Sequence, residues 1–348
     1  MKASYCRYIL HFKQASGTSR GILTDKETWF IIIEKDGKKG IGECGILRGL
    51  SIDDRPDYEQ KLQWTCQNIH LGEQKLCEEL IEFPSIQFGI EMAFLSLKSK
   101  NPFELFPSDF TKSTKSISIN GLIWMGDKRF MKAQIEDKIA QGFRCVKLKI
   151  GAIDFDKELD LLRFIRSNFD ENNIEIRVDA NGAFNSKEAL FKLNQITGFK
   201  LHSIEQPIKK DNTDMMSVLC KSAPIPIALD EELIGVFFKE EKEKLLQKIM
   251  PQYIVLKPSF IGGFRGTLEW ISIAEKLHIG WWITSALESN VGLNAIAQFT
   301  FLQNNLMPQG LGTGSLYTNN FDCPLTVSDG QLWYDKNMDW KIDLINFQ

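Results

Sequence analysis

Short apolar runs, each closed by a polar or ionisable residue, recur at nearly constant intervals through the middle of the chain. The residues that close six of these runs are Lys149, Asp179, Glu205, Asp230, Lys257 and Ser285. They are separated by 30, 26, 25, 27 and 28 residues, which is the length of one strand–helix unit. Amphipathic helical patterns lie between most of the runs, for example at 156–169 and 264–277. This alternation predicts βαβ units and a parallel sheet.

Two architectures fit such an alternation, a closed barrel and an open doubly wound sheet. About eight strand-like runs lie between residues 116 and 312, and eight strands close a (β/α)8-type barrel. In an open sheet, strands far from the switch point share no crevice. In a barrel, the carboxyl ends of all strands meet at one mouth. Five successive ionisable residues at strand ends therefore favour a TIM-type α/β barrel.

The run "CVKLKI" at 145–150 shows why the wider pattern matters. Its period of two indicates a strand, with Lys147 and Lys149 on one face. Taken alone, the run is typical of a strand with a solvated lysine face. On a barrel strand, the apolar residues face the surrounding helices and the two lysines face the interior near its mouth.

The segments on either side of the predicted barrel have a different character. Strand-like runs flank the turn "KDGKKG" at 35–40, and the pattern is helical from about residue 56 to residue 100. The tail from 319 to 348 has further strand-like runs and a turn signal, "SDG". We expect an α+β capping domain at 1–115, completed by 319–348, and a barrel catalytic domain at 116–318.

Composition excludes several classes of protein. The net charge is −3 and no long basic tract occurs, so we expect no nucleic-acid partner. No apolar window approaches eighteen residues and the first residues lack a secretory apolar segment, so we expect no membrane association. The seven cysteines are irregularly spaced, which indicates a reducing cytoplasm. Whether the protein forms a homo-oligomer stays open.

The chemistry of the predicted mouth begins with three carboxylates. Asp179, Glu205 and Asp230 end three consecutive strands, so they should lie within reach of one ion. Oxygen ligands suit Mg²⁺, with Mn²⁺ as the alternative, whereas the four histidines form no ligand-spaced pair. Each acidic residue alone would more commonly cap a loop or helix. Three clustered carboxylates without a cation would repel one another, so together they predict a metal site.

Two lysines flank the predicted metal ligands. Lys149 ends the strand before them and Lys257 ends the strand after them, while Lys147 lies one step deeper beside Lys149. A lysine next to a divalent cation can remove a proton α to a carboxylate, and the cation then stabilises the developing enediolate. The expected partner is a small-molecule carboxylate substrate.

The strand-end motifs resemble those of the muconate-lactonizing subgroup of the enolase superfamily, whose sites are known to combine a lysine base with Mg²⁺. The residues that carry this resemblance are "KLKIG", "RVDANGAF", "SIEQPI", "ALDEEL" and "VLKPSFIGGF". Four further segments resemble the o-succinylbenzoate synthase family within that subgroup, and together the motifs cover essentially the whole chain. These segments are "GTSRGILTDKETWF", "GIGECGIL", "ITSALESNVGLNAIAQF" and "QGLGTGSLYTNNF".

The resemblance implies an α+β capping domain over a (β/α)7β barrel. The implied reaction is dehydration of 2-succinyl-6-hydroxy-2,4-cyclohexadiene-1-carboxylate to 2-succinylbenzoate, a step of menaquinone biosynthesis. By the family motif, Lys149 is the base that takes the α-proton and then assists departure of the hydroxyl. Lys257 faces the opposite side of the ring and stabilises the anionic intermediate.

Arg177 and Asn181 flank Asp179 and are candidates for substrate binding. Arg177 shares the strand face of Asp179 and could bind an anionic group of the substrate. The alternative is an ion pair with a neighbouring metal ligand. Asn181 would orient the substrate or only shape the turn.

Four other residues each have two interpretations. Ser285 could hold the succinyl carboxylate, or it could cap the following helix together with Glu288, which fits a cap better. Gly262 and Gly263 would allow close backbone approach to substrate or make a tight turn. Arg20 would reach over the mouth from the capping domain or lie in solvent. Trp281 and Trp282 are expected in the barrel core.

Other activities remain as rivals to the dehydration. An N-succinylamino acid racemase or a dipeptide epimerase of the same subgroup would use Lys149 and Lys257 as two bases. Dipeptide epimerases tend to carry an Asp-x-Asp motif near the eighth strand, and residues 310–321 lack one. A barrel used only for binding would not need both lysines and three carboxylates. A Schiff-base aldolase would not need the carboxylates.

Overall fold

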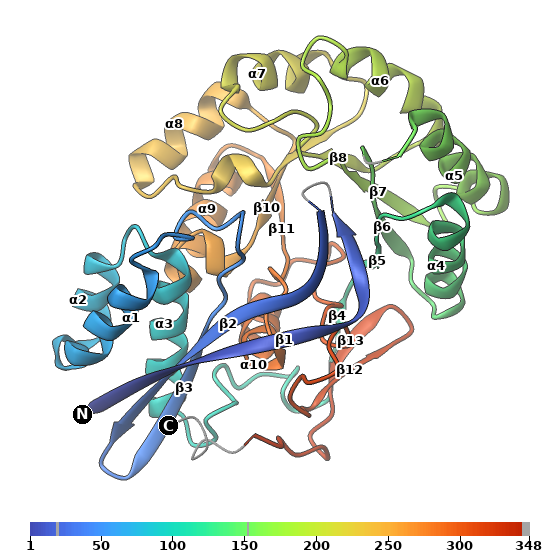
Figure 1. Cartoon of the computed structure of the whole chain (residues 1–348). Coiled ribbons are helices and arrows are strands. Elements are labelled where there is room, and N and C mark those ends of the chain that lie inside the picture. The colour runs from blue at the N-terminus through green and yellow to red at the C-terminus, as the bar shows by residue number, and fades with distance from the viewer. Residues whose placement is uncertain (19–20, 152, 343–348) are drawn as a thin grey trace.

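A seven-stranded parallel sheet forms the centre of the computed structural model, which describes residues 1–18, 21–151 and 153–342 (Figure 1). Its strands follow the chain order from one edge to the other, as strand–helix repeats require. They are β5 (Gly121–Ile123), β6 (Cys145–Lys149), β7 (Glu175–Asp179), β8 (Ser203–Glu205), β9 (Ile227–Leu229), β10 (Tyr253–Leu256) and β11 (Gly280–Ile283).

Residues 309 and 310 connect the two edges of this sheet. Gln309 forms a parallel bridge with Ile119, next to β4 (Ile117–Ser118), and Gly310 forms one with Thr284, just beyond β11. The Gly310 amide donates to Ile283 O at 2.9 Å and the Gln309 amide donates to Ser118 O at 2.8 Å. The sheet therefore curls into an α/β barrel-type fold, in which all strand ends share one mouth.

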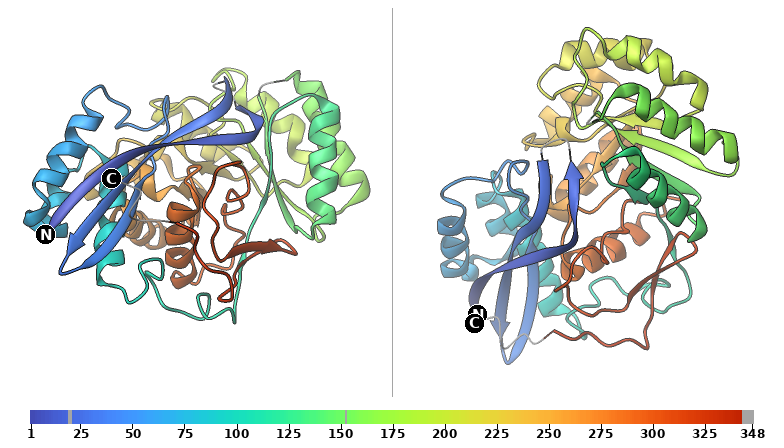
Figure 2. Two further views of the ribbon diagram at one scale, coloured as in Figure 1. Left: turned by 60° about the horizontal axis from the view of Figure 1, so that its bottom comes forward. Right: turned by 45° about the vertical axis from the view of Figure 1, so that its right-hand side comes forward.

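Helices cover the outer face of the sheet (Figures 1 and 2). They are α4 (Lys128–Ala140), α5 (Phe155–Asn168), α6 (Ala189–Ile196), α7 (Thr213–Ser222), α8 (Lys239–Ile249), α9 (Gly263–Lys276) and α10 (Asn290–Leu302). In α5, Leu159, Leu162 and Ile165 recur with the helical period, and all three are buried against the sheet. The helices predicted at 156–169 and 264–277 are thus confirmed within one residue at each end. No helix in the described ranges is long and apolar enough to cross a bilayer.

The N-terminal part pairs an antiparallel sheet with three helices. The sheet contains β1 (Lys2–Thr18), β2 (Gly21–Lys35) and β3 (Lys38–Cys44), and the helices are α1 (Tyr58–Gln67), α2 (Gly72–Glu79) and α3 (Pro84–Lys98). A Cβ atom on Gly42 of β3 would lie only 1.8 Å from the Gly89 carbonyl oxygen of α3. Glycine at this position therefore permits the close approach of strand and helix.

The hairpin β1–β2 extends from the N-terminal sheet across the mouth of the barrel (Figures 1 and 2). Phe12 bridges Tyr317, and Gly17 bridges Met125 just beyond β5. The C-terminal segment contacts both parts of the molecule, because Asn319 bonds the backbone of β1 while β12 (Leu325–Ser328) and β13 (Gln331–Tyr334) form a sheet with β4.

Two buried carboxylates of the N-terminal part receive hydrogen bonds from barrel helices. Glu43 of β3 accepts from the amides of Ser289 and Gly292, each at 2.8 Å, at the start of α10. Glu91 of α3 accepts from the amides of Phe264 and Arg265 at the start of α9. Each carboxylate satisfies amide groups that have no partner within their own helix, and its charge lies at the favourable end of the helix dipole.

Replacing Glu91 with glutamine is expected to change how stability depends on pH. Burial raises the pKa of Glu91 from 4.5 to about 7, although the two amides oppose this. The folded protein therefore binds more protons than the unfolded chain between these values, so its free energy of unfolding falls as pH rises from 4.5 to 7. The rise in pKa corresponds to at most about 3 kcal/mol. Denaturant titrations across this range should show the fall in the parent and a smaller fall in E91Q. Equal slopes would contradict this assignment.

Candidate active site

Three carboxylates form a row at the carboxyl ends of neighbouring strands, as the sequence predicted. Lys149 of β6 pairs in register with Asp179 of β7, and Asp179 pairs in register with Glu205 of β8. Asp230 follows β9 directly. The three carboxylates are almost completely buried, with at most 2% of each residue exposed.

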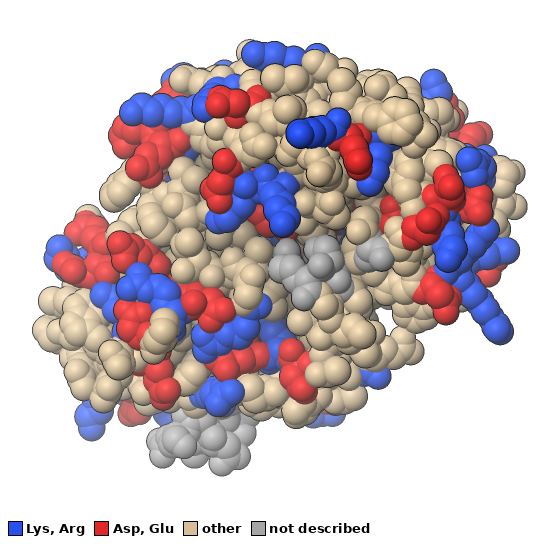
Figure 3. Space-filling model, turned by 45° about the horizontal axis from the view of Figure 1, so that its top comes forward, with Lys and Arg blue, Asp and Glu red and all other residues tan. Residues whose placement is uncertain are grey.

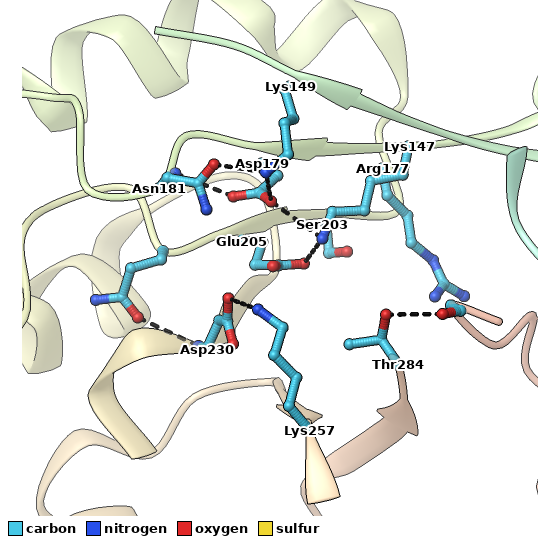
Figure 4. A network of polar contacts seen from close by, with 12 residues as sticks. Lys147, Lys149, Arg177, Asp179, Asn181, Ser203, Glu205, Asp230, Lys257 and Thr284 are labelled. Atoms are coloured by element: carbon cyan, nitrogen blue, oxygen red, sulfur yellow. Dashed lines mark hydrogen bonds and ion pairs between the residues drawn. The ribbon is translucent and has the colours of Figure 1, made fainter. Parts of the chain in front are cut away.

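Three lysines surround this row of carboxylates. Lys147 Nζ lies 2.5 Å from Glu205 Oε2 and 3.0 Å from Asp179 Oδ2. Lys149 Nζ lies 3.1 Å from Asp179 Oδ2 and donates to Asn181 Oδ1 at 2.7 Å. Lys257 forms an ion pair with Asp230 from the other end of the row. Figure 4 shows the carboxylates between Lys149 on one side and Lys257 on the opposite side.

The charges of the cluster shift its pKa values in different directions. Burial disfavours the Lys147 ammonium, but the charges of Asp179 and Glu205 outweigh burial and raise the pKa of Lys147. Burial also acts on Asp179, yet its contacts with two lysines lower its pKa. Burial and the charge of Asp179 raise the pKa of Glu205, which contacts a single lysine. Further positive charge near Glu205 would therefore stabilise its ionised carboxylate.

The donor set fits a hard divalent cation. Glu205 Oε1 is buried and has no hydrogen-bond partner within the described ranges. As the side chains stand, no group of three or more Asp, Glu, His or Cys residues in the described part of the chain is arranged around a metal position. Lysine ammonium groups lie against the same carboxylates instead. The oxygen ligands on adjacent strands and the unpartnered Glu205 oxygen are what a Mg²⁺ site requires.

A cavity of about 430 Å³ opens beside this cluster. Its inner wall includes Lys147, Lys149, Asp179, Asn181 and Lys257. Its outer wall comes from two N-terminal segments, 21–23 of the β1–β2 hairpin and 47–50 after β3. The N-terminal part therefore closes the mouth over the lysines and carboxylates.

The side of the cavity opposite the carboxylates presents hydroxyl and amide groups. Ser285 Oγ and Thr313 Oγ1 lie 2.6 Å apart, and both residues line the cavity, as does Asn120. Sequence reasoning found Ser285 but missed Thr313, Asn120 and the segment 47–50. Asn120 directly follows the first apolar run of the barrel, so the rule that strand ends carry site residues could have found it. Thr313 and residues 47–50 lie in loops without such a signal.

The structure places Arg177 differently from both interpretations of the sequence. It is 1% exposed and does not line the cavity. Its Nε donates to Glu175 at 2.6 Å, its Nη1 donates to Pro308 O at 2.9 Å, and its guanidinium lies 4.2 Å from the centre of the Trp282 ring. Arg177 lies two residues before Asp179 on β7, deeper in the barrel than the predicted metal ligands. Its ion pair is therefore formed with Glu175 and not with one of those ligands. Trp281 and Trp282 are both buried, as expected, and Trp282 also lines the cavity.

For the other candidates, the structure distinguishes between the interpretations that the sequence left open. Gly262 and Gly263 lie outside the cavity and have φ angles of 93° and 69° at the start of α9, so they form the turn. Glu288 does not cap α10, because Ser289 is the N-cap residue and accepts from the Val291 amide. Asn181 lines the cavity and also shapes the turn, with a φ of 44°. Arg20 lies outside the described residues.

The fold and this site define a barrel enzyme whose lysines and carboxylates are grouped at one mouth, and known proteins are similar to the chain in sequence and fold. The family model described as enolase C-terminal domain-like matches residues 130–337, and the model for the MenC N-terminal domain matches residues 1–97. An o-succinylbenzoate synthase of Desulfotalea psychrophila is 47% identical over 95% of this chain and 98% of its own length. The crystal structure of MenC from the same organism superposes with a TM-score of 0.85 at 43% identity, over 96% of this chain and 99% of its own. An N-succinylamino acid racemase of Thermus thermophilus is 28% identical over 79% of this chain and 75% of its own length.

The first family model matches more than half of the chain, and the Desulfotalea relative is similar over almost its whole length. The chain belongs to the o-succinylbenzoate synthase family of the enolase superfamily.

Proposed function

We propose that the protein is an o-succinylbenzoate synthase, a hydro-lyase that dehydrates 2-succinyl-6-hydroxy-2,4-cyclohexadiene-1-carboxylate to 2-succinylbenzoate in menaquinone biosynthesis. The observation that carries the proposal is the placement of Lys149 and Lys257 on opposite sides of the Asp179–Glu205–Asp230 row (Figure 4). A flat ring bound in the cavity would have one lysine against each of its faces. The family relationship to the Desulfotalea synthase supports the same activity.

Lys149 is proposed as the base and as the acid. In its neutral form, Nζ takes the ring proton α to the carboxylate, and the resulting ammonium returns a proton to the departing hydroxyl on the same face. The hydroxyl leaves as water and the ring becomes aromatic. Asp179 and Asn181 hold Nζ in position for both transfers, with contacts of 3.1 and 2.7 Å.

Lys257 is proposed to stabilise the negative charge that develops in the transition state from the other face. Burial disfavours its ammonium, but the charges of Asp230 and Glu205 raise its pKa, and an ammonium at this position would lie against the face of the ring opposite Lys149. Lys147 would hold Asp179 and Glu205 in place. Enolase-superfamily enzymes depend on a divalent metal ion, and a bound Mg²⁺ would neutralise charge on the substrate carboxylate. Asp179, Glu205 and Asp230 would hold it, with Mn²⁺ as an alternative.

The succinyl carboxylate is proposed to lie at the hydroxyl side of the cavity. Ser285 and Thr313 present adjacent hydroxyl groups there, and Asn120 adds an amide. The residues before β5 and those around Gln309 would complete a (β/α)7β barrel. The proposed domains are 1–115 with 319–348 over a barrel at 116–318. The face shown in Figure 3 carries interspersed acidic and basic side chains, which suits a cytoplasmic enzyme of small-molecule metabolism.

Comparison of two substrates tests this assignment. The purified protein with Mg²⁺ should have a kcat/KM for the cyclohexadiene substrate at least about 10²-fold above that for N-succinyl amino acids. The physical reason is that the elimination needs a single base and is favoured by formation of the aromatic ring, whereas racemisation needs two bases. A higher kcat/KM for the N-succinyl amino acids would overturn the assignment.

N-succinylamino acid racemisation is the second candidate. The opposed lysines are also what a two-base inversion needs, and the Thermus racemase is a relative over most of the chain. Incubation of N-succinyl amino acids in deuterated water should show α-proton exchange with inversion if this activity is present. Exchange without inversion would mean that Lys257 does not deliver a proton.

A further inference from the structure

Glu231 is a buried carboxylate beside the active site that the proposed reaction does not use. It begins the 3₁₀ turn η3 (Glu231–Leu233), which follows β9 and Asp230 directly. Only 6% of the residue is exposed, and it is not among the described residues that line the cavity. Its Oε1 accepts from Asn181 Nδ2 at 3.0 Å. Glu231 therefore contacts the active site through Asn181.

Asn181 lies beside Lys149 and Asp179 at one end of the carboxylate row (Figure 4). Its backbone amide donates to Asp179 Oδ1 at 3.0 Å. Its side-chain oxygen, Oδ1, accepts from Lys149 Nζ at 2.7 Å, and its side-chain nitrogen, Nδ2, is the donor to Glu231. The side-chain amide of Asn181 thus has the proposed base at its oxygen end and a buried carboxylate at its nitrogen end.

The orientation of this amide decides whether the lone pair of neutral Lys149 is available. A neutral amine has two N–H bonds and one lone pair. Lys149 Nζ lies 3.1 Å from Asp179 Oδ2 and 2.7 Å from Asn181 Oδ1, so two oxygen atoms can accept both N–H bonds. The lone pair then remains for a ring proton of a substrate in the cavity. With the amide reversed, Nδ2 would donate a hydrogen bond to that lone pair, and Lys149 would be a weaker base.

Glu231 is the neighbour that keeps the amide in this orientation. The Lys149 ammonium only donates, so it requires the oxygen of Asn181 beside it. Neutral Lys149 both donates and accepts, so it no longer distinguishes between the oxygen and the nitrogen. An ionised carboxylate only accepts, so Glu231 requires Nδ2 in both states of the lysine. Reversal of the amide would place Asn181 Oδ1 against Glu231 Oε1, and two acceptors without a proton between them are an unfavourable arrangement.

We infer that Glu231 is a positioning residue for the base: by accepting from Asn181 Nδ2, it keeps the Asn181 oxygen towards Lys149 and leaves the lysine lone pair to the substrate. The inference rests on the proposed function, in which Lys149 removes the ring proton. Because the described cavity wall does not include Glu231, its replacement should slow proton transfer without weakening substrate binding.

Steady-state kinetics of the full-length protein at saturating Mg²⁺ test the inference with E231Q. Glutamine has the size of glutamate, but it donates as well as accepts, so both orientations of the Asn181 amide become possible. We expect kcat for the cyclohexadiene substrate to fall at least about 10-fold, with KM within about 3-fold of the parent. Calorimetry should show an Mg²⁺ affinity within about 3-fold of the parent, because the proposed metal ligands are unchanged. A kcat within about 3-fold of the parent, or a loss of kcat matched by an equal loss of Mg²⁺ affinity, would overturn the inference.

E232Q is the matched control. Glu232 is the next residue and is equally buried, with 6% exposed. Its carboxylate accepts from Gln206 Nε2 at 3.1 Å and from the Asp211 amide at 3.3 Å, so the orientation of the Asn181 amide does not depend on it. E232Q should keep kcat within about 3-fold of the parent. A loss as large as that in E231Q would mean that any change in this turn slows the reaction, and the inference would be wrong.

The double variant N181D/E231Q exchanges the donor and the acceptor and keeps the net charge. The new carboxylate accepts from Lys149, and the new amide donates to that carboxylate, so the lysine again faces only acceptors. Its kcat should be at least about 3-fold above that of E231Q, and a double variant no faster than E231Q would contradict the inference. If E231Q does not fold, the double variant carries the test: a kcat within about 10-fold of the parent supports the inference, and a lower value overturns it.

Carbamylation by cyanate gives a readout that needs no substrate. The neutral amine of a lysine attacks isocyanic acid through its lone pair, so the rate at the Lys149 peptide, followed by mass spectrometry, reports whether that lone pair is available. Loss of the negative charge of Glu231 would by itself favour neutral amines and accelerate carbamylation of Lys149 and Lys257. We expect Lys149 to react more slowly in E231Q than in the parent, without such slowing at Lys257 or in E232Q.

This measurement also separates the inference from the proposed function. Should the parent prove inactive on the cyclohexadiene, the proposed function fails, and the carbamylation rate of Lys149 still decides the inference. Equal or faster carbamylation of Lys149 in E231Q would overturn it.

Discussion

Replacing Lys149 with alanine is expected to lower the rate of 2-succinylbenzoate formation at least about 10³-fold. The Lys149 ammonium lies against Asp179 and Asn181 at one end of the carboxylate row, the position from which it can reach a ring proton in the cavity. In K149A, Lys147 is the remaining described lysine on the Lys149 side of the cavity. Its ammonium is paired with Asp179 and Glu205, so it should not replace Lys149 as the base. Single-turnover measurements with the purified variant would check the loss.

The controls for K149A separate loss of the base from loss of the site. K242A removes a lysine outside the cavity that is more deeply buried than Lys149, with 2% of its side chain exposed against 12%, and should retain activity. K149A should still bind Mg²⁺, because Asp179, Glu205 and Asp230 are unchanged. It should also fail to exchange the α-proton of any substrate with solvent deuterium. An active K149A variant, or one that still exchanges that proton, would mean that another group is the base.

Removal of the divalent metal ion is expected to abolish activity, and E205Q should have nearly the same effect. Glu205 is the central carboxylate of the row and the one with an unpartnered buried oxygen. Glutamine at this position presents an NH₂ group in place of one of the carboxylate oxygens, and a cation needs oxygen ligands. The affinity for Mg²⁺ should therefore fall about 10-fold to 100-fold. Isothermal calorimetry of Mg²⁺ binding and rates at increasing Mg²⁺ would measure both effects.

Chelator-treated parent protein should recover full activity with Mg²⁺ and should also respond to Mn²⁺. E91Q removes a buried carboxylate that does not line the cavity and should bind Mg²⁺ like the parent. Full activity of chelator-treated protein, or an E205Q variant with unchanged Mg²⁺ affinity, would remove Glu205 from the set of proposed metal ligands.

The arrangement at the barrel mouth could be predicted because it depends on local signals that repeat. Each apolar run ends in one polar residue, and parallel strands bring consecutive ends together. That rule predicts that Lys149, Asp179 and Glu205 lie side by side, and in the structure they pair in register on β6, β7 and β8. The likeness of the motifs to a known family then supplied the reaction, which spacing alone could not provide.

The depth of a side chain within the barrel could not be predicted in the same way. A period of two places Arg177 on the same face as Asp179, and the structure agrees. That period does not say that Arg177 lies below the cavity, where Glu175, Pro308 O and Trp282 surround it. Contacts made only when the fold closes have no local signal at all. The bonds of Glu43 and Glu91 to the starts of α10 and α9 are of this kind, and so is the cavity position of Thr313.

The most direct test of the central claim is an NMR assay of the purified parent protein with the cyclohexadiene substrate, once with Mg²⁺ and once after treatment with a chelator. We expect the aromatic signals of 2-succinylbenzoate to grow in the presence of Mg²⁺ and to stay absent without it. If no aromatic product forms with Mg²⁺, or if it forms equally fast without a metal ion, the proposed dehydration at the Lys149–Lys257 site is wrong.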